Sequence, residues 1–194
     1  MRMFVALYPG DEAIAHLAGA LQSLHTETSS AVRWIPPERW HITLAFLAEV
    51  DPARVERLHQ SLAEVAAAHT PLEVLHLESA GAFGPTVWIG VAPTHRGTPA
   101  EQLAKAVQRA CRTAGLEVEH RPWRAHLSIA RVRTRASDEA KTLTQCLVTE
   151  LADYSGPAWT ASSITLVHSI LGPQPEHIPV GRCALGRVEI VNVE

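Results

Sequence analysis

Two short stretches decide the fold: His41-Ile42-Thr43-Leu44 and His126-Leu127-Ser128-Ile129. Each places a histidine two residues before a hydroxyl side chain, with apolar residues at the alternate positions. In a β-strand, residues two apart share one face and lie roughly 6.5–7 Å apart along the chain. Each stretch therefore predicts a strand that buries its apolar side chains and presents a histidine and a hydroxyl group to a cleft.

A similar order of elements surrounds the two stretches. Hydrophobic periodicity predicts a helix and two strands after His41, and a helix and strands after His126, which makes a weak internal repeat. We expect strands at residues 3–8, 32–35, 41–47, 72–80, 86–92, 126–132, 162–171 and 182–192, and helices at 11–28, 51–69, 98–115 and 137–152. This order, without any GxGxxG or GxxxxGK[ST] sequence, favours an antiparallel α+β fold over a doubly wound sheet.

Local signals support these boundaries. Asp51 and Thr98 each precede a proline, which is the pattern of a helix N-cap followed by proline at the first helical position. Gly115 suits the end of the third helix, and Ser137 suits the start of the fourth. In the strand at 41–47, alternation puts His41, Thr43, Ala45 and Leu47 on one face, with Ile42, Leu44 and Phe46 on the other.

The chain has 194 residues, a formal net charge of −3 and 46% hydrophobic residues. This length suits one compact domain over residues 1–194, or two small lobes that share one core and meet at the loop at 94–98. The apolar content excludes a disordered chain. The charge excludes a wholly basic nucleic-acid binder but leaves room for a local basic groove.

Cysteine content and hydropathy indicate the compartment. Cys111, Cys146 and Cys183 are far apart and form no CxxC pair, which is typical of a reducing environment. The N-terminal apolar run is too short for a secretion signal, and no run reaches the roughly 18–20 apolar residues of a membrane helix. We therefore expect a soluble, cytoplasmic protein with no membrane partner.

Paired histidines suit the hydrolysis of a phosphodiester. One imidazole would take a proton from water while the other gives a proton to the leaving oxygen, and two hydroxyls would hold the non-bridging oxygens. Histidine suits both transfers because its pKa lies near working pH, and each transfer is worth about 10²–10⁴ in rate. The other nine histidines show no HxxxH or HExxH spacing, so the sequence predicts no metal site. Among them, His168 would line the cleft or lie on the surface or in the core.

The motifs and their surroundings resemble the 2H phosphoesterase superfamily. Within it, they are most similar to the bacterial RNA 2′,3′-cyclic phosphodiesterases, also called 2′-5′ RNA ligase-like proteins. The resemblance rests on the two motifs and, in the family's order, on segments 32–36, 46–47, 81–83, 121–123 and 168–173. It implies a bilobal α+β fold, with two pseudo-twofold-related antiparallel sheets and outer helices around a central cleft, and with no metal or other cofactor.

The resemblance also implies roles. The family opens a 2′,3′-cyclic phosphate on RNA to leave a 2′-phosphate. Carried over to the matching positions, His41 gives a proton to the departing 3′ oxygen and His126 activates water. Thr43 and Ser128 would bind the phosphate. The expected partner is RNA or a nucleotide with a 2′,3′-cyclic phosphate, bound by a monomer, and reversal of this chemistry would allow 2′-5′ RNA joining.

Arg131 matches a family position that helps to hold the phosphate. It lies five residues after His126, an odd separation that turns it away from the cleft in a regular strand. A bulge or a strand end is therefore required to turn it back. The chain departs from the family pattern at Trp123, Ala125 and Ser128 and around residues 175–178, which bears on substrate detail more than on the chemistry.

Other side chains near the motifs have two interpretations. Arginines between residues 121 and 135 would form a basic rim for RNA, or they reflect a chain with 15 arginines and 2 lysines, in which arginine is the default cation. Flanking aromatic residues would stack on a base or belong to the core. The arginines are Arg121, Arg124, Arg131, Arg133 and Arg135, and the aromatic residues are Trp34, Trp40, Phe83 and Trp123.

A second hypothesis is a non-catalytic nucleotide- or RNA-binding module on the same fold, since a fold does not determine function. A pure binder would not need two proton-transfer groups, and both are intact. Binding of a 2′-phosphonucleotide without turnover would favour this alternative. An RNA 3′ end, a tRNA half and a small cyclic nucleotide all fit the pattern as substrates.

Overall fold

The computed structural model describes residues 1–28, 31–119, 122–133, 138–172 and 175–186. The strands are β1 (Met3–Leu7), β2 (Val32–Trp34), β3 (Ile42–Leu47), β4 (Leu72–Phe83), β5 (Thr86–Ala92), β6 (His126–Val132), β7 (Trp159–Ala161), β8 (Ser163–Ile170) and β9 (Glu176–Ala184). The helices are α1 (Asp11–Thr28), α2 (Val55–Ala67), α3 (Pro99–Thr113) and α4 (Asp138–Glu150), with short 3-10 turns η1 (Pro37–Arg39) and η2 (Pro52–Arg54). The predicted α+β class is confirmed.

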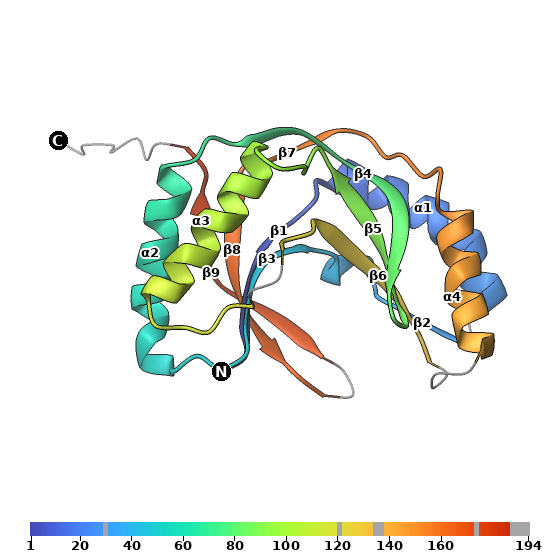
Figure 1. The fold of residues 1–194 in the computed structure, drawn as a ribbon, viewed down its shortest axis with the longest axis horizontal. Helices are drawn as coiled ribbons and strands as arrows, with labels where there is room; N and C mark the ends of the chain where they lie inside the picture. Colours follow the sequence, from blue (N-terminus) through green and yellow to red (C-terminus); the bar gives the residue numbers. More distant parts are fainter. Residues whose placement is uncertain (29–30, 120–121, 134–137, 173–174, 187–194) are drawn as a thin grey trace.

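The strands form a curled antiparallel sheet in the order β7-β4-β5-β6-β3-β1-β8-β9, with β2 beside β6 (Figure 1). β3 and β6 meet through a single residue pair, Ile42 and Leu127. This narrow junction divides the strands into two halves of one continuous sheet, in place of the two sheets that the resemblance implies. β1, β8 and β9 extend the half that contains β3, whereas β4, β5 and β7 extend the half that contains β6.

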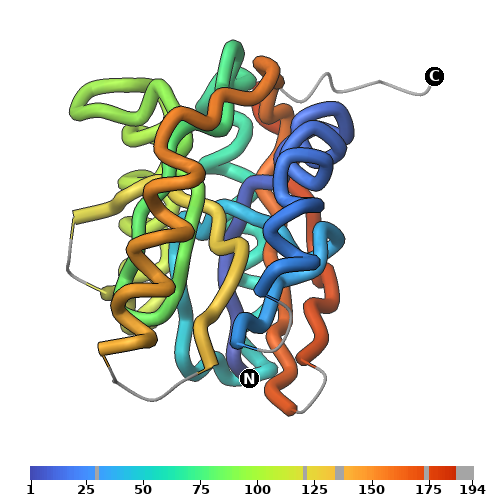
Figure 2. Tube along the Cα trace, turned by 90° about the vertical axis from the view of Figure 1, so that its right-hand side faces the viewer, coloured from blue at the N-terminus to red at the C-terminus, as the bar shows by residue number. Residues whose placement is uncertain are grey.

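Helices cover the outer side of each half. α2 and α3 pack against each other and against strands of the β3 half, while α4 packs against β4, β5 and β6. Figures 1 and 2 show α1 beside α4 on the outside of the β6 half. Apolar residues from helices and strands form the core between these layers, and burial of such surface is the main favourable term in folding.

The internal repeat is present as an order of elements. β3 is followed by α2, β4 and β5, and β6 is followed by α4, β7 and β8. Because β3 and β6 are antiparallel neighbours, half a turn about an axis between them exchanges the two strands. The repeat therefore brings both motifs to the middle of the sheet.

Capping residues act largely as predicted. Thr98 Oγ1 accepts a hydrogen bond from the backbone N–H of Glu101 over 3.4 Å, at the start of α3. Gly115 follows α3 with a φ of +77°, which glycine adopts without steric cost. Asp51 Oδ1 accepts from the N–H of Ala53 over 3.0 Å, but it caps η2, since α2 begins only at Val55. Ser137 lies outside the described residues.

The last strand differs from its prediction. The sequence predicts it at 182–192, whereas β9 covers Glu176–Ala184 and residues 187–194 lie outside the described part. Pro179 suggests a loop, but β9 is an edge strand, where proline is tolerated, and the register shifts beside it. The short strand β7 was not predicted. In the described part of the chain, no helix is both long and apolar enough to cross a membrane.

Candidate active site

The two motifs meet at a small cavity of about 70 Å³. His41 and Thr43 reach it from the β3 half, and His126 and Ser128 reach it from β6. The other lining residues are Ile35, Arg39 and His177. The structure thus brings together all four motif residues that the sequence assigns to one cleft.

Both motif histidines are oriented by the same hydrogen bond. Nδ1 of His41 donates to the carbonyl oxygen of Arg39 over 2.7 Å. Nδ1 of His126 donates to the carbonyl oxygen of Arg124 over 2.8 Å. A carbonyl oxygen only accepts, so each Nδ1 carries the proton. Nε2 is therefore the nitrogen of each ring at which a further proton can bind.

The surroundings of the two rings differ. His41 stacks on Phe4, with ring centroids 4.5 Å apart and planes at 20°, and His177 meets it edge-on at 5.2 Å. The pKa of His41 is lowered to about 4, mainly by burial, and nearby positive groups contribute to this lowering. In the free protein at neutral pH, His41 is therefore uncharged. His126, by contrast, is half-buried and lies edge-on to Phe83, with ring centroids 5.1 Å apart.

Each central strand contains a β-bulge just after its motif. The pairing of β3 with β1 skips Leu44, and the pairing of β6 with β5 skips Ile129. An extra residue reverses the alternation of side chains along a strand. Phe46 and Arg131, each five residues after its histidine, consequently face the cleft side, while the residues on either side of them are buried.

The bulges settle two expectations about strand faces. The bulge at Ile129 turns Arg131 toward the cleft side, whereas a regular strand would turn it away. Arg131 is nevertheless exposed, and it is not among the residues that line the cavity. The prediction that Ala45 and Leu47 share the face of His41 is wrong, because the bulge buries both and brings Phe46 to that face. A bulge leaves no periodic signal in the sequence, so alternation alone did not reveal it.

Two cavity residues were missed by the sequence reasoning. Arg39 lies at the end of η1, and His177 lies on β9. Arg39 precedes His41 by the same interval that separates Arg124 from His126, and this repeated Arg-x-His spacing is a signal that would have found it. His177 belongs to a segment that matches the family poorly, so nothing in the pattern distinguished it. Burial lowers the pKa of His177, and the charge of Arg39 lowers it further.

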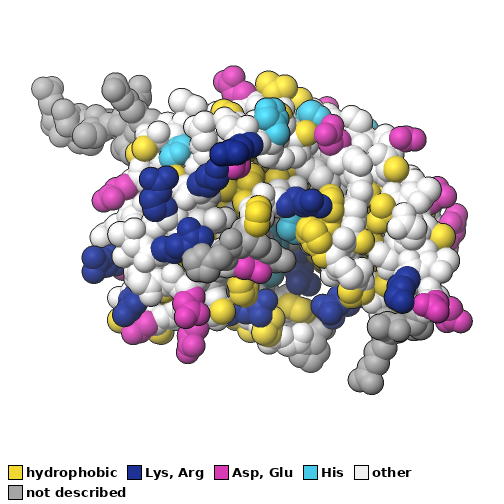
Figure 3. Space-filling view, viewed as in Figure 1, with side chains coloured by type: hydrophobic (Ala, Val, Ile, Leu, Met, Phe, Trp, Pro, Cys, Tyr) yellow, Lys and Arg dark blue, Asp and Glu magenta, His cyan; other side chains and the backbone are white. Residues whose placement is uncertain are grey.

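A larger groove of about 790 Å³ adjoins the cavity and shares Thr43 and His126 with it. Phe83 lines it with 41% of its surface exposed, and Trp123 donates its indole N–H to the carbonyl oxygen of Thr43 over 2.8 Å. The guanidinium of Arg124 lies 5.9 Å from the ring centre of Phe83. In Figure 3, Lys and Arg side chains gather around the middle of the face in view, beside a histidine.

The other aromatic candidates lie away from the groove. Trp40 is 1% exposed and donates its indole N–H to the carbonyl oxygen of Ile35 over 2.8 Å, so it belongs to the core and does not stack on a base. Trp34 packs against the core beside His25. Trp88, which the sequence reasoning did not select, is half-buried with its ring 6.0 Å from that of His126.

The predicted arginine rim is present only in part within the described structure. Arg124 lines the groove, and Arg131 and Arg133 are exposed. Arg121 and Arg135 lie outside the described residues. The interpretation as a basic rim for RNA therefore rests on Arg124 and Arg131, and it stays a prediction.

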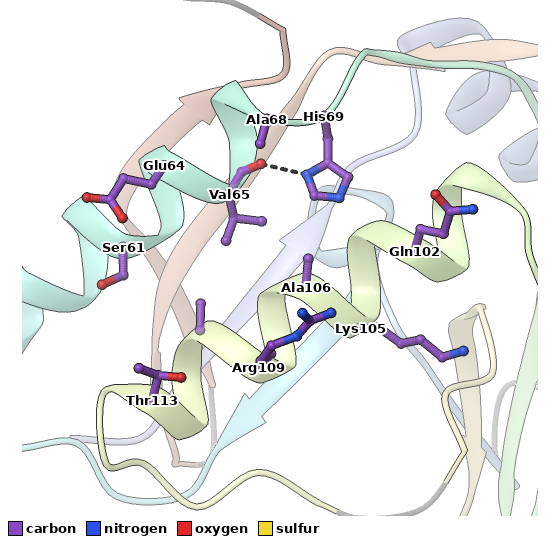
Figure 4. A pocket seen from close by; sticks show the side chains of 11 residues that line it. Ser61, Glu64, Val65, Ala68, His69, Gln102, Lys105, Ala106, Arg109 and Thr113 are labelled. Carbon is purple, nitrogen blue, oxygen red and sulfur yellow. Dashed lines mark hydrogen bonds between the residues drawn. The ribbon is translucent and has the colours of Figure 1, made fainter.

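Other histidines and grooves lie outside this cavity. Among them, no group of three or more His, Cys, Asp or Glu is placed to hold a metal ion. His168 is half-buried on β8 and is not among the residues that line the cavity. A groove of about 620 Å³ between α2 and α3 contains His69, whose Nδ1 donates to the carbonyl oxygen of Val65 over 2.7 Å (Figure 4). None of the four motif residues lines that groove.

Solved structures share this architecture. The protein TT0787 of Thermus thermophilus superposes with a TM-score of 0.77 and 18% identity, over 96% of this chain and 99% of that one. E. coli LigT complexed with 3′-AMP superposes with a TM-score of 0.73 and 20% identity, over 95% and 97% of the two chains. The fold is therefore that of the LigT-like, two-lobed α+β proteins.

Sequence comparison narrows this class to a family. A sequence model of the 2′-5′ RNA ligase superfamily matches residues 9–172. An RNA 2′,3′-cyclic phosphodiesterase of Archaeoglobus fulgidus is 32% identical over 145 residues, 72% of this chain and 77% of that protein. One of Geobacillus stearothermophilus is 36% identical over 103 residues, 50% of this chain but only 32% of that protein's length. The chain belongs to the 2′-5′ RNA ligase superfamily, which confirms the resemblance drawn from the motifs.

Proposed function

We propose that the protein hydrolyses RNA 2′,3′-cyclic phosphate ends to 2′-phosphates by acid–base catalysis from two histidines, without a metal ion. The observation that carries this proposal is the single cavity to which both motifs contribute a histidine and a hydroxyl. The hydrogen bonds at Nδ1 support Nε2 of His41 and of His126 as the nitrogens that exchange protons in this proposal. The relatives named RNA 2′,3′-cyclic phosphodiesterases support the same activity.

The proposed reaction moves two protons. Nε2 of His126 takes a proton from water, whose oxygen attacks the phosphorus. The bond from phosphorus to the 3′ oxygen breaks, and that oxygen takes the proton of His41 Nε2, which leaves a 3′-hydroxyl and a 2′-phosphate. The hydroxyls of Thr43 and Ser128 donate to the non-bridging oxygens, and Arg131 adds positive charge from farther along β6. Each proton transfer contributes about 10²–10⁴ in rate.

The low pKa of His41 bears on this division of roles. In the free protein this pKa is about 4, mainly because the ring is buried. His41 is therefore uncharged at neutral pH. A bound phosphodiester is negatively charged, so it favours the protonated ring and raises this pKa. The same observation also favours the reverse assignment, in which His41 takes the proton of water and His126 gives one.

A change of leaving group distinguishes the two assignments. A 2′,3′-cyclic phosphate with sulfur in place of the 3′ bridging oxygen releases a thiolate, which needs little protonation. If His41 is the acid, His41→Ala regains most of its lost rate on this substrate, whereas His126→Ala stays slow. Rescue of His126→Ala alone establishes the reverse assignment.

The groove beside the cavity is the proposed path of the RNA chain. The rings of Phe83 and Trp123 and the guanidinium of Arg124 line it, and stacking gives about 1–3 kcal/mol per base without sequence choice. One chain supplies every residue of this path, so a monomer suffices. The three free cysteines fit action in the cytoplasm. Transfer of the phosphate to a 5′-hydroxyl instead of water would leave a 2′-5′ RNA linkage.

Product analysis tests the proposal. An oligonucleotide that ends in a 2′,3′-cyclic phosphate is incubated with the protein in the presence of EDTA, and the product is identified by mass spectrometry and chromatography against 2′- and 3′-phosphate standards. The expected product is the 2′-phosphate, at the same rate with and without EDTA. A 3′-phosphate, or loss of the rate in EDTA, contradicts the proposed mechanism. Binding of a 2′-phosphonucleotide without turnover of any cyclic phosphate establishes the non-catalytic binding module instead.

A further inference from the structure

The cavity contains two polar side chains that belong to neither motif. Arg39 reaches it from the end of η1, and His177 reaches it from the edge strand β9. Among the described residues that line the cavity, Arg39 is the one Lys or Arg side chain, and none is a carboxylate. The wall of the cavity therefore has hydrogen-bond donors and positive charge, with no acidic group to neutralise them.

Both side chains carry a buried nitrogen that has no hydrogen-bond partner in the described structure, namely Nε of Arg39 and Nδ1 of His177. Arginine Nε always carries a hydrogen and only donates. A buried donor left unpaired is unfavourable, so native proteins seldom retain one without a purpose. The carbonyl oxygen nearest in sequence, that of Arg39 itself, already accepts from His41. An acceptor from outside the chain would pair with these nitrogens, and an anion would also balance the charge.

The ring of His177 is held by aromatic neighbours. It meets the ring of Phe4 at 4.9 Å and 73°, and that of His41 at 5.2 Å and 81°, which are favourable edge-to-face arrangements. The pairing of His177 with Ser169 anchors its backbone to β8. The ring is thus positioned at the cavity wall, and its Nδ1 has no hydrogen-bond partner in the described structure.

We propose that Arg39 and His177 form an anion-binding subsite that contacts the non-bridging oxygens of the substrate phosphate. The identity of this ligand as an RNA phosphodiester rests on the proposed function. Nε–H of Arg39 donates to one oxygen, and Nδ1–H of His177 donates to the same phosphate. Together with the hydroxyls of Thr43 and Ser128, these donors fix the phosphorus relative to Nε2 of His41. Strand β9 is thereby part of the active site.

Inorganic phosphate is the probe for this subsite, because it binds without turnover. Its dissociation constant is measured by calorimetry for the wild-type protein, Arg39→Met and His177→Phe. Methionine keeps much of the aliphatic packing and phenylalanine keeps the ring, while both remove the donor. We expect each change to weaken phosphate binding roughly ten- to hundred-fold, as for the loss of a hydrogen bond to a charged group. Arg39→Lys, which keeps the charge, should recover part of the affinity.

His25→Phe is the matched control. His25 also lies against an aromatic ring, that of Trp34 at 4.3 Å, and also has a buried ring nitrogen without a partner in the described structure. It does not line the cavity, so His25→Phe should bind phosphate like the wild-type protein. A loss of affinity in this control equal to that in His177→Phe overturns the subsite.

Turnover of a cyclic phosphate is measured on the same variants to separate this proposal from the proposed function. Wild-type phosphate affinity in folded Arg39→Met and His177→Phe overturns the subsite, whether or not the protein is an enzyme. Weakened phosphate binding in a protein that turns over no cyclic phosphate overturns the proposed function and keeps the subsite. If His177→Phe fails to fold, the ring ¹⁵N resonances of His177 in the wild-type protein provide the test. The proposal requires them to shift on addition of phosphate. Unchanged resonances overturn it.

Discussion

The β3 half and the β6 half of the active site carry the same local arrangement in different surroundings. His41 and His126 each donate Nδ1 to the carbonyl oxygen two residues earlier, and each is followed by a bulge at the same interval. They differ in the side chains that cover them. Phe4 and His177 enclose His41, whereas His126 is half-buried beside the ring of Phe83.

This difference bears on the proposed reaction, which is asymmetric although the scaffold is nearly symmetric. The proposed hydrolysis needs one histidine that gives a proton and one that takes a proton. Active sites make such assignments by placing similar groups in environments that separate their pKa values. Here both rings are held by the same kind of hydrogen bond at Nδ1, while burial of the His41 ring lowers the pKa of His41 to about 4.

Removal of either imidazole should have the largest effect. His41→Ala and His126→Ala should each lower kcat by about 10²–10⁴-fold, because each abolishes one proton transfer. Their stabilities should differ, since His41→Ala leaves a cavity beside Phe4 and lowers the Tm, whereas His126→Ala changes it little. Cyclic-phosphate turnover and thermal unfolding measure the two effects. The control is His95→Ala, at an exposed histidine, which should leave both the turnover and the Tm unchanged. Near-normal turnover in either motif variant would refute the paired mechanism.

The pH dependence of stability tests the environment of His41. Its pKa lies at about 4 in the folded state, below the ordinary value of 6.5. Between these values the unfolded chain binds a proton at His41 that the folded chain does not, so the free energy of unfolding falls as the pH falls. From pH 6.5 to 4 this amounts to roughly 3 kcal/mol.

Urea unfolding at several pH values measures this dependence. Above pH 6.5 the contribution of His41 is complete, and it is lost progressively toward pH 4. His41→Gln should flatten the curve by that amount relative to the wild-type protein. Parallel curves for the two proteins over this range would mean that burial does not hold His41 uncharged.

The hydroxyls provide a smaller test, in which the two motifs should behave alike. Thr43→Val and Ser128→Ala should each lower kcat/KM roughly ten- to hundred-fold, as for the loss of a hydrogen bond to a charged group. The exchanges Thr43→Ser and Ser128→Thr keep the hydroxyl and should retain most of the activity. Steady-state kinetics on a cyclic nucleotide measures both sets. Full activity without a hydroxyl at either position would remove that residue from the phosphate site.

The smallest effect is expected at Arg131, which follows the bulge in β6 and has Phe46 as its counterpart in β3. Arg131 is exposed and lies beyond the cavity lining, so solvent screens its charge. Arg131→Ala should raise KM by less than about tenfold, more at low salt than at high salt, and leave kcat unchanged. Arg57→Ala, which removes the same charge from the outer helix α2, should leave both constants unchanged. Equal effects of the two changes on KM would mean that Arg131 acts through the net charge of the protein and not through contact with the substrate.

Local patterns account for what was predictable. Capping chemistry at Thr98 and Gly115 located α3, and the alternation of apolar residues around His126 located β6. The bulges were not predictable in this way, because a skipped residue depends on the partner strand. His177 was missed for a related reason, since β9 is recruited to the sheet edge by pairing with β8 despite its proline.

The sequence by itself determined the α+β class, the family and the pair of motifs, because hydrophobic periodicity, capping residues and the spacing of His and hydroxyl side chains are local. Only the tertiary structure decided that Arg39 and His177 join the motif residues at one cavity, and that His41 is enclosed while His126 is half-buried. The physical reason is that burial and the pKa of a side chain depend on atoms brought into contact from distant segments. Two nearly identical stretches of sequence therefore acquire different chemical properties only after folding.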